Sequence, residues 1–205
     1  MPETVTVYFD YLCPFAWRGA EVADIVAKTL ELDFVWRHFS LYQSNHKGQA
    51  NWQLWNEKID PEDDCGNQGL LPFLASCAAR CQGEEKFNTF RLAALRARHC
   101  ERKAFNLATL FEVAEEVALH LPRFERDLWN PEFRTMLAQE HYQAAALDVF
   151  GTPTFCFDKG HAAYFRIAKL PHSPEEAIDL FKDYRHMLET YPYLETIKRP
   201  RPKRN

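Results

Sequence analysis

The order of hydrophobic and polar residues predicts strand, helix and strand at the start of the chain. Residues 4–9 combine β-branched and aromatic side chains, which is typical of a buried strand. Apolar residues recur at helical spacing over 22–30, with charged side chains on the other face. Residues 33–39 again carry the side chains of a strand. The start of the chain therefore predicts two strands separated by one helix.

The middle of the chain has helical periodicity without a strand pattern. Residues 40–51 are polar and contain Gly48, which predicts a loop. The predicted helices after this loop cover residues 70–81, 84–103, 106–121 and 130–147. Asn106 is a capping residue for the third helix, and Pro122 is expected to end it. We expect residues 50–145 to form a helical subdomain.

Strand patterns return only after this helical interval. Residues 155–157 are apolar, and residues 158–160 predict a turn before a hairpin partner over 162–167. Ser173 and Glu176 form a capping box at the start of a last amphipathic helix. Because strands flank the helices on both sides, the pattern predicts one α/β frame with a helical insertion and not two tandem domains.

Composition and charge exclude several classes of protein. The chain has 205 residues, and 46% of them are hydrophobic, which is ordinary for a globular protein with a core. Its net charge of −4 argues against general nucleic-acid affinity, and no segment approaches the ~20 apolar residues of a membrane span. The chain enters a strand almost at once, without a basic and apolar leader. We therefore expect a cytoplasmic protein whose six cysteines are mostly reduced.

Cys13 lies at the junction between the first strand and the first helix. The free amides at a helix start and the helix macrodipole favour a thiolate, which predicts a lowered pKa and a nucleophilic sulfur for Cys13. Pro14 fits this junction because the first helical turn needs no amide hydrogen from it. A buried and inert cysteine is the alternative, because most free cysteines are of that kind.

A second motif lies late in the chain. Residues 151–155, Gly-Thr-Pro-Thr-Phe, form a turn that opens into a strand, and a cis bond before Pro153 fits such a turn. Together with residues 9–14, Phe-Asp-Tyr-x-Cys-Pro, this motif resembles the thioredoxin superfamily and, within it, the DsbA branch. More narrowly, the two motifs resemble the FrnE-like and 2-hydroxychromene-2-carboxylate isomerase-like members of that branch.

The resemblance implies an α/β, thioredoxin-like fold with a large all-helical insertion. The thioredoxin-like domain would be discontinuous, with residues 1–48 and 146–190 on either side of an insertion over 49–145. Residues 191–205 would form a C-terminal basic tail, in which residues 198–204 hold five basic side chains. The family pattern also implies that the loop after the second strand borders the active-site cleft.

One position departs from the redox members of the family. Those members carry a Cys-x-x-Cys motif, whereas the fourth position of the motif here is Ala16. Cys13 can form a mixed disulfide, but the motif offers no resolving cysteine that would release it. Ordinary dithiol oxidase activity therefore does not follow from the resemblance.

The first functional hypothesis is a monothiol oxidoreductase in which Cys13 is the nucleophile. The amides of Phe15 and Ala16 would stabilise its thiolate. The Thr152–Pro153 segment would pair with an extended thiol substrate through main-chain hydrogen bonds, as the family does. Asp10 is a candidate proton acceptor, with a structural cap as the alternative role.

Two other hypotheses remain open. A glutathione-dependent isomerase or transferase of the 2-hydroxychromene-2-carboxylate isomerase or kappa class usually has serine at the nucleophile position, and this group activates the sulfur of glutathione. Cys13 favours redox chemistry, whereas Ala16 favours the isomerase. The third hypothesis is a non-catalytic binding module. The expected partner is a thiol or disulfide substrate, with glutathione as a candidate cosubstrate and no tightly bound cofactor; the oligomeric state stays unassigned.

Several charged and sulfur-bearing residues of the insertion have no assigned chemistry. The basic helix face around Arg91, Arg98 and Arg102 is expected to be solvated, with a clamp for an anionic ligand such as glutathione as the alternative. The spacing of the insertion cysteines matches no common zinc pattern, so we expect no metal site. These cysteines are Cys65, Cys77, Cys81 and Cys100. Cys156 is expected to turn into the core with Thr154 and not to act as a resolving cysteine.

Overall fold

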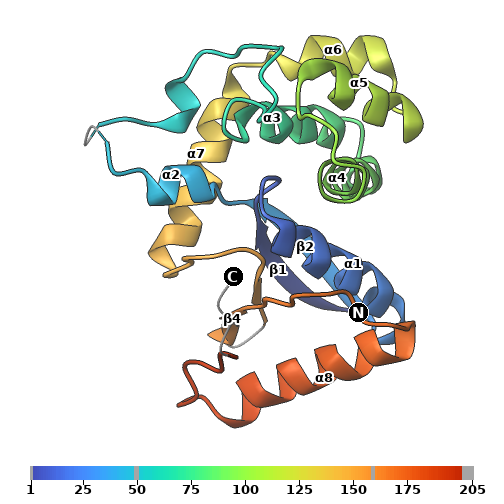
Figure 1. Ribbon diagram of the computed structural model, residues 1–205, viewed down its shortest axis with the longest axis vertical. Coiled ribbons are helices and arrows are strands. Elements are labelled where there is room, and N and C mark those ends of the chain that lie inside the picture. Colours follow the sequence, from blue (N-terminus) through green and yellow to red (C-terminus); the bar gives the residue numbers. More distant parts are fainter. Residues whose placement is uncertain (1, 49–50, 158–159, 200–205) are drawn as a thin grey trace, which may run out of the picture.

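The computed structural model describes residues 2–48, 51–157 and 160–199, and it centres on a mixed sheet with strand order β2-β1-β3-β4 (Figure 1). The strands are β1 (Glu3–Phe9), β2 (Leu32–His38), β3 (Thr154–Cys156) and β4 (Ala162–Tyr164). β1 is parallel to β2 and antiparallel to β3, and β3 is antiparallel to β4. The strands predicted on either side of the helical interval therefore join in one sheet.

The alternation of side chains in β1 divides the core between the two faces of the sheet. Val5, Val7 and Phe9 are fully buried in the large core of the molecule. Two helices that contact each other pack on this core, α1 (Pro14–Thr29) and α8 (Pro174–Thr190). Tyr8, between these positions, belongs to a smaller cluster with Phe39 and the region around the end of the last insertion helix.

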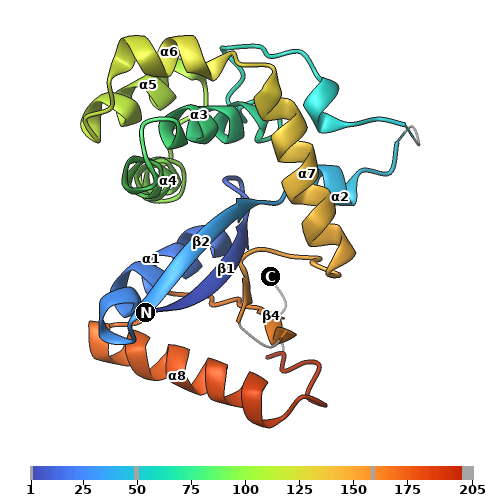
Figure 2. The same cartoon turned by 180° about the vertical axis from the view of Figure 1, so that it is seen from behind.

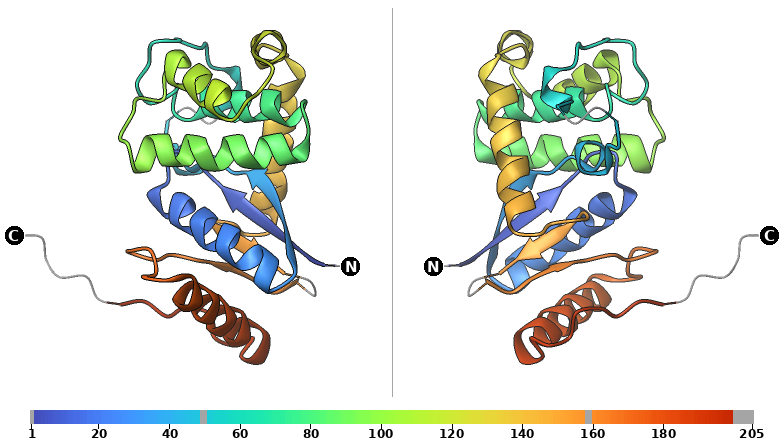
Figure 3. Two further views of the ribbon diagram at one scale, coloured as in Figure 1. Left: turned by 90° about the vertical axis from the view of Figure 1, so that its right-hand side faces the viewer. Right: turned by 90° about the vertical axis from the view of Figure 1, so that its left-hand side faces the viewer.

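Among the described residues, the chain between β2 and β3 forms helices, turns and loops and no further strand. These helices are α2 (Leu41–Asn45), the 3-10 helix η1 (Leu54–Asn56), α3 (Leu70–Arg80), α4 (Glu84–His99), α5 (Leu107–Glu116), α6 (Leu121–Leu128) and α7 (Glu132–Ala146). Figures 2 and 3 show α3 to α6 gathered at one end of the sheet, whereas α7 leads the chain back toward β3. The predicted α/β fold with a helical insertion is thereby confirmed, while the exact domain boundaries stay predictions.

Two predictions about the chain between β2 and β3 are wrong. The segment predicted as a loop contains α2, because Ser40 Oγ accepts a hydrogen bond from the Gln43 amide at 3.1 Å and caps a short helix. The helix predicted to end at Pro122 already ends at Glu116, and Ala118 then takes a left-handed conformation with φ of 54°. Pro122 lies in the first turn of α6, where a helix does not need its amide hydrogen.

Two further predictions fall partly outside the described residues, namely the turn at 158–160 and the basic tail at 198–204. The described part of the C-terminal segment, residues 191–199, is exposed. None of the helices in the described parts of the chain is long and apolar enough to cross a membrane.

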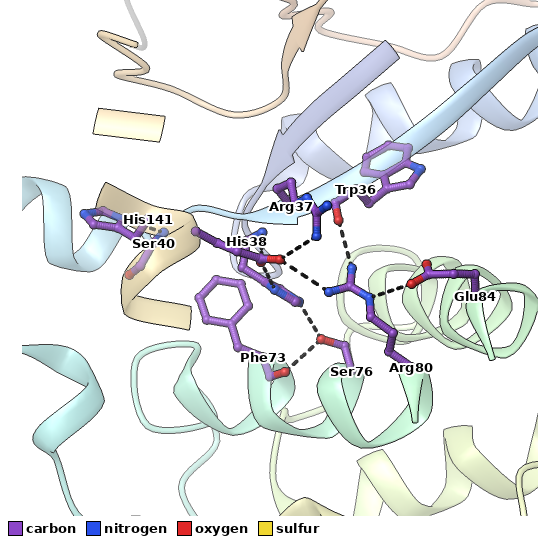
Figure 4. A network of polar contacts seen from close by, with 10 residues as sticks. Trp36, Arg37, His38, Ser40, Phe73, Ser76, Arg80, Glu84 and His141 are labelled. Atoms are coloured by element: carbon purple, nitrogen blue, oxygen red, sulfur yellow. Dashed lines mark hydrogen bonds and ion pairs between the residues drawn. The ribbon is translucent and has the colours of Figure 1, made fainter. Parts of the chain in front are cut away.

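A buried network of polar side chains joins the insertion to the sheet (Figure 4). The carboxylate of Glu140 on α7 accepts from the His38 amide at 2.8 Å and lies 2.6 Å from the ring Nδ1 of His38. The same carboxylate pairs with Arg37 at 3.1 Å and with Arg80 at 3.4 Å. The other ring nitrogen of His38 lies 2.7 Å from Ser76 Oγ on α3. The network thus fixes α7 and α3 against β2.

The charges around Glu140 outweigh the effect of its burial. Burial alone would raise the pKa of this carboxyl group. The charge and hydrogen bonds of His38, together with the charge of Arg80, instead lower the pKa of Glu140 to about 2. Glu140 is therefore an ionised carboxylate at neutral pH, and its partners compensate the cost of burying that charge.

Candidate active site

Cys13 lies between the end of β1 and the first turn of α1, as the sequence predicts. It is the N-cap residue of α1, with an extended backbone (φ −92°, ψ 114°), and Pro14 follows it in the first helical turn. Its amide donates to the Asp10 carbonyl at 3.1 Å, which closes a tight turn. The amides of Phe15 and Ala16 act on the sulfur so as to lower its pKa. The local structure therefore directs helix amides at the cysteine.

The two sequence motifs meet at the sulfur of Cys13. Its Sγ donates a hydrogen bond to the carbonyl oxygen of Thr152 at 3.2 Å, and the Thr152–Pro153 peptide bond is cis. Pro153 also packs closely on α1, because a Cβ atom added at Gly19 would clash with its Cγ. Glycine at position 19 thus allows the approach that brings both motifs into one site.

The expectation of a lowered pKa for Cys13 is wrong. The residue is only 5% exposed, and this burial raises the pKa of the thiol above its ordinary value. The side chain of Thr152 and the amides of Ala16 and Phe15 lower that pKa by less than burial raises it. The charge of Asp10 adds to the rise. Cys13 is therefore mainly a thiol at neutral pH.

Asp10 holds two backbone segments together beside Cys13 through its carboxylate. Its buried carboxylate accepts from the amide of Leu12 at 2.8 Å and from the amide of Leu41 at 2.7 Å. These bonds connect the end of β1 to the Cys13 turn and to the start of α2. Burial raises the pKa of Asp10 to about 6, although both amides oppose the rise. The geometry supports a capping role for Asp10, whereas its role as a proton acceptor stays a prediction.

An open pocket of about 490 Å³ adjoins the Cys13 turn. Its lining residues are Asp10, Leu12, Leu41, Tyr42, Asn45, His46 and Lys47. Leu12 directly precedes Cys13, whereas the last five lie in α2 and just after it. His46 stacks on Trp52, with ring centroids 4.0 Å apart. The pocket thus offers amide, imidazole and ammonium groups next to the turn that precedes Cys13.

The sequence predicted only Asp10 among these pocket residues. Leu12 lies within the first motif, and the other five lining residues were assigned to a loop that the family pattern places beside the active-site cleft. One signal could have found them: Ser40 directly follows a strand pattern, and serine is a preferred helix cap. A short helix after β2 would have placed Tyr42, Asn45 and His46 on an ordered element next to the Cys13 turn.

No described hydrogen bond or disulfide links another cysteine to Cys13. All six cysteines are free, and Ala16 is fully buried at the position where dithiol members have their second cysteine. Cys156 packs on the cluster of Tyr8 and Phe39. In the described ranges, no group of three or more His, Cys, Asp or Glu side chains is placed to hold a metal ion. The motif itself therefore leaves Cys13 without a resolving partner.

The basic face predicted on α4 is partly buried, which corrects the expectation of a solvated face. Arg91 is 4% exposed, and its guanidinium carbon lies 3.6 Å from the ring centroid of Trp36. Arg98 is half-buried and donates to two backbone carbonyls, whereas Arg102 is exposed. None of the described contacts brings these arginines to Cys13, so the alternative of a ligand clamp on α4 gains no support.

Solved structures share this fold at low sequence identity. A thioredoxin-like oxidoreductase from Silicibacter pomeroyi DSS-3 is 24% identical, with a TM-score of 0.55 over 88% of this chain and 86% of that one. The cytosolic disulfide reductase DsbM from Pseudomonas aeruginosa, solved with GSH, is 17% identical, with a TM-score of 0.59 over 93% of this chain and 100% of that one. A 2-hydroxychromene-2-carboxylate isomerase is 15% identical, with a TM-score of 0.62 over 94% of this chain and 100% of that one.

These likenesses support the predicted thioredoxin-like fold. A comparison with curated proteins finds no match. The family model described as a DSBA-like thioredoxin domain matches residues 4–170, which include both motifs and the whole insertion. The chain therefore belongs to the family of DSBA-like thioredoxin domains.

Proposed function

We propose that the protein is a thiol–disulfide oxidoreductase that uses Cys13 as its single nucleophile, with glutathione or another thiol as its reaction partner. The observation that carries this proposal is the meeting of Cys13 Sγ with the Thr152 carbonyl at the start of α1, while Ala16 replaces the second cysteine. The site places a cysteine at a helix start for the first step of disulfide exchange and lacks a motif residue for the second. An external thiol must supply that second step.

The reaction balances with thiols and disulfides alone. The Cys13 thiol loses its proton, and its sulfur attacks one sulfur of a disulfide such as oxidised glutathione. A bond forms between Cys13 Sγ and that sulfur, the original S–S bond breaks, and the departing thiolate takes up a proton. A second thiol then attacks the mixed disulfide and releases Cys13. No tightly bound cofactor is required, because thiols and disulfides carry all of the electrons.

The surroundings of Cys13 fit such partners. The pocket of about 490 Å³ has the size of a small-molecule site, and Asn45 and Lys47 offer groups that bind carboxylates and amides. The main chain of Thr152 lies beside the sulfur, where it would pair with an extended thiol substrate. The six free cysteines fit a reducing compartment, so we also propose that the protein acts in the cytoplasm.

A second candidate function is a glutathione-dependent isomerase. The observation that favours it is the state of Cys13, whose buried thiol has a raised pKa and acts as a hydrogen-bond donor. Such a thiol would donate to the sulfur of bound glutathione without forming a disulfide with it. A serine hydroxyl would do the same, so Cys13→Ser should retain isomerase activity if this second function is correct.

Mass spectrometry after exposure to oxidised glutathione tests the main proposal. We expect one glutathionyl group on Cys13, which accumulates and leaves only when external thiol is added. The Cys13→Ser variant should lose this adduct, whereas Cys100→Ser, which removes an exposed cysteine, should retain it. Modification of the exposed cysteines without modification of Cys13 would refute the proposal.

A further inference from the structure

Two arginines converge on the ring of Phe15 in the first turn of α1. The guanidinium carbon of Arg166 lies 3.8 Å from the Phe15 ring centroid, and that of Arg18 lies 5.5 Å from it. Arg18 also donates to the carbonyl of Ile167 at 3.5 Å, which connects α1 to the segment after β4. Because Phe15 is two residues from Cys13, both cations lie against the first turn of α1, which begins directly after Cys13.

The main chain holds Arg166 next to the second motif. The amide of Phe165 donates to the Pro153 carbonyl at 2.9 Å, one residue before Arg166. Tyr164 directly precedes Phe165, and the pKa of its phenol group depends on both Cys13 and Arg166. Burial raises the pKa of Tyr164, the charge of Cys13 adds to the rise, and Arg166 opposes it. Arg166 and Cys13 are therefore near enough to act on the same phenol group.

The charges of these two arginines are not balanced within the described ranges. Several other arginines pair with carboxylates, as Arg96 does with Glu21 at 2.7 Å. Among the described residues, no carboxylate forms an ion pair with Arg18 or Arg166, and Arg166 is exposed. A guanidinium that stacks on an aromatic ring keeps its N–H edges free for a carboxylate.

We propose that Arg166, supported by Arg18, binds a carboxylate of the thiol substrate and thereby selects carboxylated thiols for reaction at Cys13. This inference rests on the proposed thiol–disulfide function. The selected chemistry is a thiol with a carboxylate a few bonds from its sulfur. Glutathione and a short acidic cysteine peptide are two sources of that chemistry.

Arg166 affects how often an anionic disulfide meets Cys13 and in which orientation, and it leaves the exchange reaction itself unchanged. A positive group beside the nucleophile attracts an anionic disulfide and holds its sulfur near Cys13. Such attraction changes association rates on the order of tenfold and weakens as the salt concentration rises. A neutral disulfide gains nothing from it, which makes Arg166 a specificity-determining residue.

Rates of adduct formation at Cys13 test this inference with two pairs of probes. The first pair is oxidised glutathione and its N-acetylated, fully esterified analogue, which is uncharged. The second is a cysteine-peptide disulfide with a neighbouring glutamate and the same peptide with glutamine. We expect Arg166→Gln to slow the carboxylated probe of at least one pair on the order of tenfold at low salt, with the uncharged probes unchanged. Arg126→Gln, at an exposed arginine on α6, is the matched control and should change neither rate.

The outcomes separate this inference from the function on which it rests. If only the glutathione pair responds, the carboxylate comes from glutathione; if only the peptide pair responds, it comes from an acidic peptide. If Arg166→Gln slows charged and uncharged probes equally, or slows none, the selection of carboxylates is refuted while the reaction at Cys13 stands. If wild-type Cys13 reacts with none of the probes, the proposed function fails and this inference fails with it.

Discussion

Glu140 and Asp10 are both buried, but the pKa values of their carboxyl groups are shifted in opposite directions. Glu140 lies between His38, Arg37 and Arg80, and His38 and Arg80 lower its pKa to about 2. Asp10 receives only two backbone amides, and its pKa rises to about 6. The difference lies in the charge of the partners, because burial disfavours the ionised form of both groups.

Two regions of the molecule differ in the same way, namely in how well their buried polar groups are supplied with partners. The network around Glu140 is rich in partners, and it fixes the insertion to the sheet. In the site around Cys13, fewer partners offset the cost of burying polar groups. Its thiol has a raised pKa, and Thr152 Oγ1 is buried without a hydrogen-bond partner in the described structure. The first region is built for stability, whereas the second leaves groups available to a substrate.

The largest effect is expected from Glu140→Gln, which removes the charge at the centre of the stabilising network. The cations Arg80 and Arg37 would lose their partner, and the free energy of unfolding should fall by about 3 kcal/mol. Urea denaturation at pH 7 measures this loss. Glu132→Gln changes an exposed residue of the same helix and should have little effect. A similar small loss in both variants would show that the network contributes no more than the surface of α7.

The pH dependence of the same variant sharpens this prediction. Because the pKa of Glu140 is lowered in the folded state, its contribution is complete above the ordinary value of 4.5 and is lost as pH falls through about 2. The stability difference between wild type and Glu140→Gln should therefore narrow as pH is lowered through this window.

A smaller effect is expected at Cys13, where the pKa is raised. Alkylation of Cys13 by iodoacetamide requires the thiolate, so its rate should rise about tenfold per pH unit from pH 6 to pH 8. Asp10→Asn removes a charge that raises the pKa of Cys13, and the rate at pH 7 should increase about threefold. Peptide mapping assigns the modified site. A rate that does not change with pH would mean that Cys13 is already a thiolate.

The sequence was most informative where structure depends on neighbouring residues. The strand patterns, the Cys13–Pro14 helix start and the turn at Pro153 follow from local backbone preferences, and the family resemblance brought them together. The sequence missed features that depend on distant contacts. Arg91 is buried because Trp36 supplies a ring for it, and no pattern within α4 indicates this partner.

The pKa of Cys13 shows the same limit in the candidate site. A helix start predicts stabilisation of a thiolate, and the amides of Phe15 and Ala16 do act in that direction. The extent of burial depends on how the Thr152–Pro153 segment covers the sulfur, and it reverses the net shift. Arg166 was missed for a related reason, because only the fold places it on Phe15.

The most direct test of the central claim restores the missing cysteine. In wild type, oxidised glutathione should leave a stable glutathionyl adduct on Cys13, because Ala16 cannot attack it. In Ala16→Cys, the introduced thiol should displace glutathione and leave an intramolecular disulfide without an adduct. Ala23→Cys, at another buried position of α1, should retain the adduct and serves as the control. If wild type never accumulates an adduct on Cys13, or if Ala16→Cys accumulates it as wild type does, the monothiol account is contradicted.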